Sequence, residues 1–356
     1  MLIVDAHEDL AWNILTFGRD YTHSASAIRQ REAGTSAPTQ NDNSLLGLED
    51  WLSARVAVIM ATLFASPARK RLGEWDTLTY TTQEEAYSIA RRQVDAYDAL
   101  AGDHPQFRRV MTRADLDEVL HTWDDGKEQD EHQIGLVTLM EGADCIRQPE
   151  EVEEWYEHGV RLIGPAWEST RYAGGTHEPG PLTPDGRRLL AEMARLGMIL
   201  DLSHLAEEAY YQAVEAYPGL MIASHSNPRR FLPTSRGLSD EMILLLAERQ
   251  GVVGIVPFNA FMKPGWKKGD SREVVTLADV TSAVDHICQI TGSAEHVGFG
   301  TDFDGGFGLE SVPVGINSIA DLPQLEPHLR EKGYTTEQIG GIFGGNWLRV
   351  LRMGLP

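Results

Sequence analysis

Eight short apolar runs, rich in Val, Ile, Leu and Met, recur along the 356 residues and constrain the fold more than any other feature. Runs of this length without strict alternation of apolar and polar residues are typical of strands buried on both faces, as in a parallel sheet. Helical patterns lie between most of them. The runs cover residues 2–6, 55–65, 134–140, 159–166, 197–203, 219–224, 251–258 and 296–302.

Helix start and stop signals support this alternation. The segment 183–196 begins with Thr183-Pro184, a capping residue followed by proline at the first helical position, and Gly197 follows it. Four apolar residues inside the segment share one helical face. Capping boxes at Thr276 and Thr335 indicate two further helices, near 276–292 and after 335.

Strands that alternate with helices over this length predict an α/β fold, a (β/α)8 TIM-type barrel, with a doubly wound open sheet as the alternative. Such barrels exceed the usual single-core ceiling of roughly 250–300 residues, so we expect one barrel domain over 1–356. The polar stretch 19–43 is expected to be an insertion after the first strand, with short helices over the mouth of the barrel. The other βα loops are also expected to be long.

The charge of the chain limits its possible binding partners, and its cysteine content limits its possible disulfides and metal sites. The chain has 53 acidic and 31 basic residues, a net charge of -22, which repels nucleic acid and anionic membrane surfaces. Cys145 and Cys288 are too few for a disulfide framework or a thiolate metal site. There is no signal-peptide pattern and no long apolar run, so we expect a cytoplasmic protein without a membrane partner.

In a barrel, the carboxyl ends of all strands face one mouth, and this is where ligands bind. His7 and Asp9 follow the first run two residues apart, and side chains at that spacing on a strand point the same way. Glu8, between them, should point the other way and have a structural role. The ends of later runs add two imidazoles and two carboxylates, from Glu141, His204, His225 and Asp302.

Imidazole and carboxylate ligands without thiolate suit Zn²⁺ or another borderline divalent ion. A single histidine here could be an ordinary core residue and Glu141 a helix cap, but their joint placement favours a metal site. Five ligands exceed the needs of one catalytic ion and suit two ions that share Glu141. A metal-bridged hydroxide is available at neutral pH to attack a carbonyl or phosphoryl group. Asp302, the remaining acid, is placed to pass the proton to the leaving group.

The chain carries, in order, the segments DAHEDL, LMEG, DLSH, ASHS, SRGLSD, GTDFDG and GGNWLRVL. This set resembles the membrane (renal-type) dipeptidase family of metallopeptidases, a branch of the amidohydrolase superfamily, over nearly the whole chain. The resemblance implies one zinc ion held by His7, Asp9 and Glu141, and a second held by Glu141, His204 and His225. It also implies Asp302 as the proton-transferring acid and Arg236, eleven residues after His225, as the group that binds the free carboxylate of the substrate.

Some relatives in the superfamily bridge their metals with a carbamylated lysine, but no lysine here ends the third or fourth strand, so a carboxylate must bridge. Two positions depart from the family pattern. Trp167 stands where better-known members have a histidine after the fourth strand, with His177 nearby as a substitute. Phe258-Asn259 stands where a substrate-contacting tyrosine is often found.

We therefore expect a binuclear zinc dipeptidase, although another divalent metal is compatible with the ligands. Its substrates would be small dipeptides with a free C-terminal carboxylate, including L-Xaa-D-Xaa, and the resemblance suggests a homodimer. The alternative, motivated by Trp167 and Asn259, is an amidohydrolase acting on another small amide, an N-acyl amino acid or a lactam. A metal-binding protein without turnover is a third hypothesis, which the spare acid Asp302 disfavours.

Overall fold

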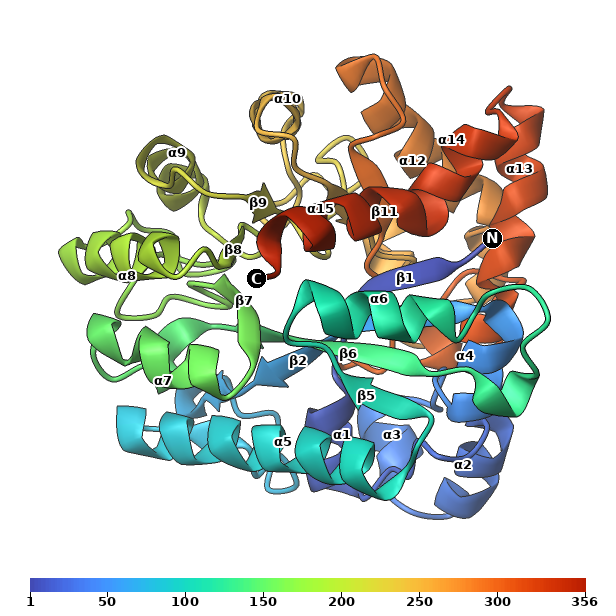
Figure 1. Cartoon of the computed structure of the whole chain (residues 1–356), viewed down its shortest axis with the longest axis horizontal. Helices are drawn as coiled ribbons and strands as arrows, with labels where there is room; N and C mark the ends of the chain where they lie inside the picture. Colours follow the sequence, from blue (N-terminus) through green and yellow to red (C-terminus); the bar gives the residue numbers. More distant parts are fainter.

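The computed structural model describes residues 1–356 and contains a strand at each of the eight predicted runs (Figure 1). These strands are wholly or almost wholly buried, which explains why their sequences do not alternate. The barrel strands are β1 (Ile3–Glu8), β2 (Val56–Phe64), β6 (Ile134–Glu141), β7 (Val160–Gly164), β8 (Ile199–Asp201), β9 (Met221–Ile222), β10 (Val253–Ile255) and β11 (Val297–Phe299).

The strands pair in parallel in the order β10-β11-β1-β2-β6-β7-β8-β9, and the two edge strands meet. Ala223, next to β9, bridges to Val253 of β10, and the amide of Gly254 donates to the Ala223 carbonyl at 2.8 Å. A Cβ on Gly254 would lie 1.8 Å from the Ser224 carbonyl oxygen, so this close approach requires glycine. The sheet is therefore a closed (β/α)8 barrel, as predicted, and the open-sheet alternative is wrong.

Helices surround the barrel, and the three predicted caps are present. Thr183 accepts a hydrogen bond from the Gly186 amide, and capping boxes begin α12 and α14. The helices are α1 (Leu10–Phe17), α2 (Ala25–Glu32), α3 (Ala37–Asn41), α4 (Leu48–Ala54), α5 (Gln83–Asp103), α6 (Arg113–His121), α7 (Val152–Glu157), α8 (Pro184–Arg195), α9 (Glu207–Ala216), α10 (Asp240–Glu248), α11 (Asn259–Met262), α12 (Leu277–Thr291), α13 (Leu325–Glu331), α14 (Thr336–Gly340) and α15 (Asn346–Gly354).

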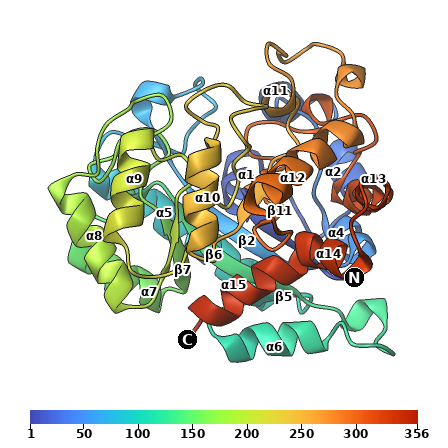
Figure 2. The same ribbon diagram turned by 90° about the horizontal axis from the view of Figure 1, so that it is seen from above.

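The two ends of the barrel differ. One end is covered by β5 (Phe107–Arg109), α6 and α15, whereas α11, which follows β10, lies at the opposite end (Figure 2). The long loop after β2 contains a separate two-stranded sheet, β3 (Ser66–Pro67) with β4 (Thr79–Tyr80), and the sequence did not predict these two strands. None of the helices combines the length and apolar character that a membrane span requires.

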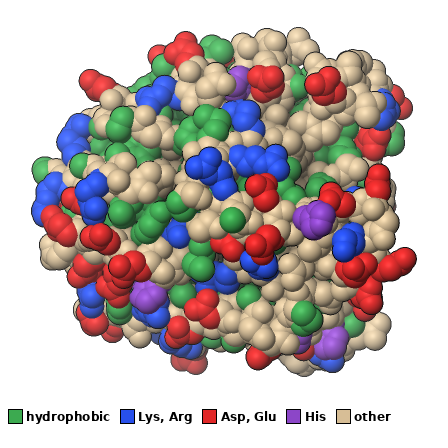
Figure 3. Space-filling model, in the orientation of Figure 1, with side chains coloured by type: hydrophobic (Ala, Val, Ile, Leu, Met, Phe, Trp, Pro, Cys, Tyr) green, Lys and Arg blue, Asp and Glu red, His purple; other side chains and the backbone are tan.

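A continuous hydrophobic core of 101 buried residues fills the barrel and the layer between strands and helices. On the face seen in Figure 3, acidic and basic side chains are intermingled. Exposed pairs such as Arg352–Asp117, at 3.1 Å, contribute at most about 1 kcal/mol each. The core, rather than surface ion pairs, therefore accounts for most of the stability.

The predicted insertion at 19–43 contains α2 and α3 and is fixed by the buried carboxylate of Asp304. Arg19 lies 3.0 Å from this carboxylate, and Tyr21, Ser44 and the Leu45 amide donate hydrogen bonds to it at 2.7–2.9 Å. The insertion thus packs against the loop after β11. It contributes no residue to the cavity at the mouth of the barrel.

Replacing Asp304 with alanine should lower the free energy of unfolding by about 3–5 kcal/mol, because it breaks a buried ion pair and leaves buried donors unsatisfied. Urea denaturation of Asp304→Ala and of Asp117→Ala, an exposed-pair control, measures this. A loss of less than about 1 kcal/mol for Asp304→Ala would contradict the anchoring role assigned to it.

Candidate metal centre and active site

The structure brings all five predicted ligands together at the carboxyl end of the barrel. His7 lies near the end of β1, Asp9 follows β1, and Glu141 ends β6. His204 and His225 lie in the turns after β8 and β9. Three groups of three have ligand atoms within 4.8 Å of one another: His7-Asp9-Glu141, Glu141-His204-His225 and His7-His225-Asp302. The first two are the ligand sets that the family resemblance implied.

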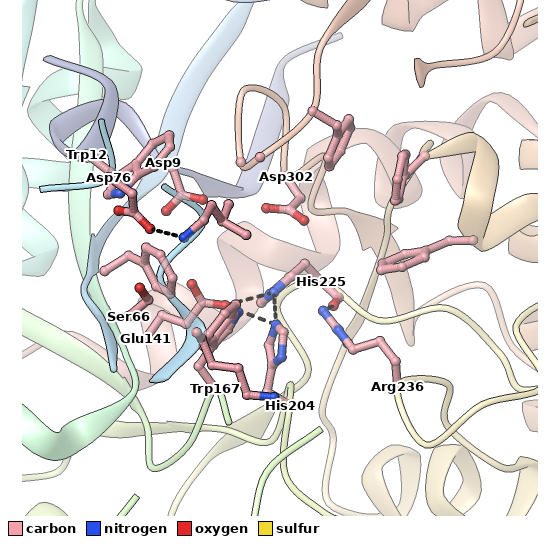
Figure 4. Close-up of a pocket in the computed structure, with 18 residues that line it drawn as sticks. Asp9, Trp12, Ser66, Asp76, Glu141, Trp167, His204, His225, Arg236 and Asp302 are labelled. Carbon is pink, nitrogen blue, oxygen red and sulfur yellow. Dashed lines mark hydrogen bonds and ion pairs between the residues drawn. The ribbon is translucent and has the colours of Figure 1, made fainter. Parts of the chain in front are cut away.

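Glu141 lies between the two sets. Its Oε1 atom is 3.1 Å from the Nε2 atoms of both His204 and His225, and its Oε2 atom is 3.7 Å from Nε2 of His7 (Figure 4). The two carboxylate oxygens therefore face different imidazole groups. This is the arrangement that a bridging carboxylate needs.

The orientation of each histidine is set by a hydroxyl. Ser224 donates its hydrogen to Asp201 at 2.5 Å, so its oxygen acts as an acceptor towards Nδ1 of His225 at 2.8 Å and Nδ1 of His7 at 3.3 Å. Thr176 similarly contacts Nδ1 of His204 at 2.8 Å. With Nδ1 engaged in this way, Nε2 of each neutral ring is left for a metal.

These supporting residues were not predicted from the sequence, although two of them stand inside its segments DLSH and ASHS. Asp201 belongs to DLSH and Ser224 to ASHS. Thr62 of β2, which donates to the Asp9 carboxylate, carried no signal at all. Glu8 points away from the site, as predicted, and accepts a hydrogen bond from the indole of Trp51 at 3.1 Å.

Asp302 lies beside the same cluster, with its carboxylate 3.9 Å from Nε2 of His7. Its backbone is left-handed, with φ 57°, as is that of His204, with φ 66°. Non-glycine residues adopt this conformation at a cost, and such strain is concentrated at functional sites. A Cβ on Gly305 would lie 2.3 Å from the Asp302 carboxylate and 2.7 Å from that of Asp9, so glycine is required between the two acids.

Burial and mutual repulsion perturb the carboxyl groups. Desolvation raises the pKa of Asp9 to about 6 and raises that of Asp302 well above its usual value. Burial opposes ionisation of Glu141 as well, but the charge of His7 and hydrogen bonds from His204 and His225 lower its pKa. A bound cation favours the ionised form of all three groups.

The imidazoles respond to the same surroundings. Burial lowers the pKa of His204 to about 4 and that of His225 well below its usual value, so both rings are neutral, the form that binds metal. Burial also opposes protonation of His7, but the charges of Glu141, Asp9 and Asp302 raise its pKa to about 9. A metal ion at Nε2 would take the place of that proton.

The residues fit a divalent metal centre. The Nε2 atom of His7 is buried without a hydrogen-bond partner, and the Nε2 atoms of His204 and His225 face each other at 2.9 Å. Buried polar nitrogens without ordinary partners, next to buried carboxylates, are costly unless a cation joins them. The donor set of imidazole and carboxylate, without thiolate, suits zinc.

A cavity of about 240 Å³ opens onto this cluster. Arg236, on the loop after β9, lines it and is almost fully buried, yet no carboxylate of the protein lies within 4.0 Å of its guanidinium. It donates only to the Ser226 hydroxyl and the His225 carbonyl. Arg19, by contrast, is buried against two carboxylates. An isolated buried guanidinium indicates a site for an anionic ligand group.

The residues at the two positions that depart from the family pattern differ in whether they line the cavity. Trp167 lines the cavity, so it does occupy the predicted position at the site. His177 does not line it, because its exposed ring pairs with Glu168 at 2.7 Å. The side chain of Asn259 is buried and donates to the Val312 carbonyl, and Phe258 lines the cavity instead. The long loop after β2 supplies four lining residues that were not predicted from the sequence, Ser66, Lys70, Leu72 and Asp76.

Comparisons with known proteins identify relatives of this chain. The family model described as Membrane dipeptidase (Peptidase family M19) matches residues 1–354. An uncharacterized protein of Klebsiella pneumoniae is 29% identical over 62% of this chain and 82% of its own length. An uncharacterized dipeptidase of Schizosaccharomyces pombe is 28% identical over 79% of this chain and 64% of its own length, slightly less than two thirds of that protein.

Among solved structures, a metallo peptidase from Rhodobacter sphaeroides, liganded with a phosphinate mimic of the dipeptide L-Ala-D-Ala, shares the fold. The TM-score is 0.79 with 21% sequence identity, and the match covers 99% of both chains.

Substitutions in the candidate metal centre should affect the two ligand sets differently. In His7→Ala one ion is lost preferentially, because the Glu141-His204-His225 set is intact. In Ser224→Ala the affinity for both ions falls, by about 10–100-fold, because Ser224 contacts a histidine of each set. Metal analysis after dialysis against graded chelator measures both, with Ser66→Ala as a control. Retention of two ions in His7→Ala would contradict the assignment of this set.

Proposed function

This chain belongs to the membrane dipeptidase family, and from that premise we propose that it is a binuclear zinc dipeptidase, with the whole chain forming one hydrolase domain. Its substrates would be small dipeptides with a free C-terminal carboxylate, including L-Xaa-D-Xaa. We assign His7, Asp9 and Glu141 to one ion, and Glu141, His204 and His225 to the other. The dipeptide mimic in the Rhodobacter sphaeroides structure supports this substrate class.

The observation that carries the proposal is the buried guanidinium of Arg236, which pairs with no carboxylate of the protein and lies beside the candidate metal ligands. A guanidinium binds a carboxylate through two parallel hydrogen bonds, and burial makes such a pair strong. A substrate held in this way places its last peptide bond, one residue from the carboxylate, near the cluster. This geometry favours dipeptides, because a carboxylate held by Arg236 leaves one residue on the C-terminal side of the scissile bond.

The reaction then depends on the residues around the cluster. Two divalent ions would supply an acidified water molecule and polarise the scissile carbonyl. Asp302, whose carboxylate faces His7, accepts the proton of the attacking water and delivers it to the departing amine. Gly305 lets the chain pass close to the carboxylates of Asp302 and Asp9, because a Cβ there would collide with both.

One observation favours the alternative, an amidohydrolase acting on another small amide, an N-acyl amino acid or a lactam. Trp167 lines the cavity, and its indole N–H offers one neutral hydrogen bond where the better-known family members have a histidine. This position would suit a substrate whose carbonyl oxygen needs only a neutral hydrogen-bond donor during hydrolysis.

A dipeptide panel tests the proposal. The metal-loaded protein should cleave members of an L-Xaa-L-Xaa and L-Xaa-D-Xaa set, and Arg236→Ala should lower kcat/KM by about 10–100-fold, as expected for loss of hydrogen bonds to a charged group. Arg230→Ala, an exposed arginine of the same loop, is the matched control. Activity that survives Arg236→Ala unchanged would favour the alternative substrates, and no cleavage of any dipeptide would refute the dipeptidase.

The role of Asp302 is tested separately. Asp302→Asn keeps the size of the side chain but removes the proton acceptor, so kcat should fall by about 10²–10⁴-fold. The metal content should stay at two ions, as measured by metal analysis on the same preparation. Unchanged hydrolysis would rule out Asp302 as the acid. If no variant and no substrate revealed turnover, the chain would be a metal-binding protein.

A further inference from the structure

An aromatic wall lines the cavity on the side of Arg236, and it consists of Phe258, Phe261 and Phe307. Resting on the proposed dipeptidase function, we propose that this wall is the subsite for the side chain of the C-terminal residue, and that it selects substrates with a large apolar residue there. The wall is built from two βα loops, since Phe258 and Phe261 follow β10 and Phe307 follows β11.

The three rings form one continuous surface. Phe258 and Phe307 are stacked, with ring centroids 4.3 Å apart and planes inclined by 16°. Phe261 packs edge-on against Phe258 at 5.0 Å. Trp266 supports Phe258 from behind, at 6.1 Å, and does not line the cavity. This packing fixes the rings before a ligand binds, so little conformational entropy is lost when a side chain contacts them.

Arg236 connects the wall to the substrate. Its guanidinium carbon lies 5.6 Å from the centre of the Phe261 ring. The α-carbon of a C-terminal residue is bonded directly to the carboxylate that Arg236 would hold. The side chain on that α-carbon is therefore within reach of Phe261, whereas the side chain of the N-terminal residue begins on the far side of the scissile bond.

The opposite side of the cavity has a different character. Figure 4 shows Arg236 on one side of the group formed by Glu141, His204 and His225, and Trp12, Ser66 and Asp76 on the other. Lys70 also lines the cavity and lies 3.5 Å from Glu168. The charged side chains of Lys70 and Asp76 thus line the cavity away from Arg236, where they stand beside the ring of Trp12. An apolar C-terminal side chain is buried against the rings, while a charged one would lose its hydration without gaining a partner.

Substrate preference tests the subsite. Initial rates with Ala-Gly, Ala-Ala, Ala-Leu, Ala-Phe, Ala-Glu and Ala-Lys, each chiral C-terminal residue in L and D form, give kcat/KM for the zinc-loaded protein. For one of the two stereoisomers, Ala-Leu and Ala-Phe should exceed Ala-Gly by about 10–100-fold, the range for burial of one large apolar side chain. Leu-Ala and Phe-Ala, compared with Gly-Ala, should show a smaller effect.

Variants of the aromatic wall test whether it causes the preference for a large apolar C-terminal residue. In Phe261→Ala the ratio of kcat/KM for Ala-Phe to that for Ala-Gly should fall at least fivefold, and Phe261→Leu should retain an intermediate ratio. Phe231→Ala, a partly buried phenylalanine outside the cavity, should keep the wild-type ratio. Circular dichroism on each variant identifies any that fails to fold, and the wild-type panel decides the question in that case.

The outcomes separate the two proposals. If the protein cleaves dipeptides but hydrolyses Ala-Gly as fast as Ala-Leu and Ala-Phe in both the L and the D series, the subsite is overturned and the dipeptidase proposal stands. A preference that Phe261→Ala leaves unchanged also overturns the subsite. Cleavage of no dipeptide overturns the proposed function, and the subsite falls with it.

Discussion

The carboxylate of Glu141 is the contact on which the rest of the site depends. One of its oxygens faces His204 and His225, and the other faces His7, so a single side chain links groups from four strands of the barrel. Closure of the barrel makes this possible, because β6 lies across from the junction of β9 and β10. An open sheet would leave His225 and Glu141 at distant strands.

Around this contact, the protein buries several like charges within a small space. Two of them are tied to neutral donors or to the backbone, Asp9 to Thr62 and Asp201 to the Ser224 hydroxyl and amide. Such bonds orient the groups but do not remove their repulsion. Divalent cations would do so, which is the physical link between the crowding of acids and the proposed metal centre. Arg236 stands apart, since it remains a buried cation available to a ligand.

The barrel itself was predictable because its strands are buried on both faces, and this burial imposes short continuous apolar runs that the sequence displays directly. The helix caps at Thr183, Thr276 and Thr335 were predictable for a similar reason, since a cap depends on residues three positions apart. The two strands in the long loop after β2 escaped prediction because they have two residues each, too few for any periodic pattern. The position of the 19–43 insertion depends on Asp304, almost three hundred residues away.

The sequence by itself determined which residues stand at strand ends, and therefore which side chains meet at the mouth of a parallel barrel. It determined the residue types, imidazole and carboxylate, that make a metal centre chemically reasonable. Only the tertiary structure decided that one hydroxyl, Ser224, orients histidines of both ligand sets, that His177 turns to Glu168, and that three phenylalanines stand beside Arg236. The reason is that these contacts join different loops, whose paths are set by packing at long sequence separation and leave no local pattern.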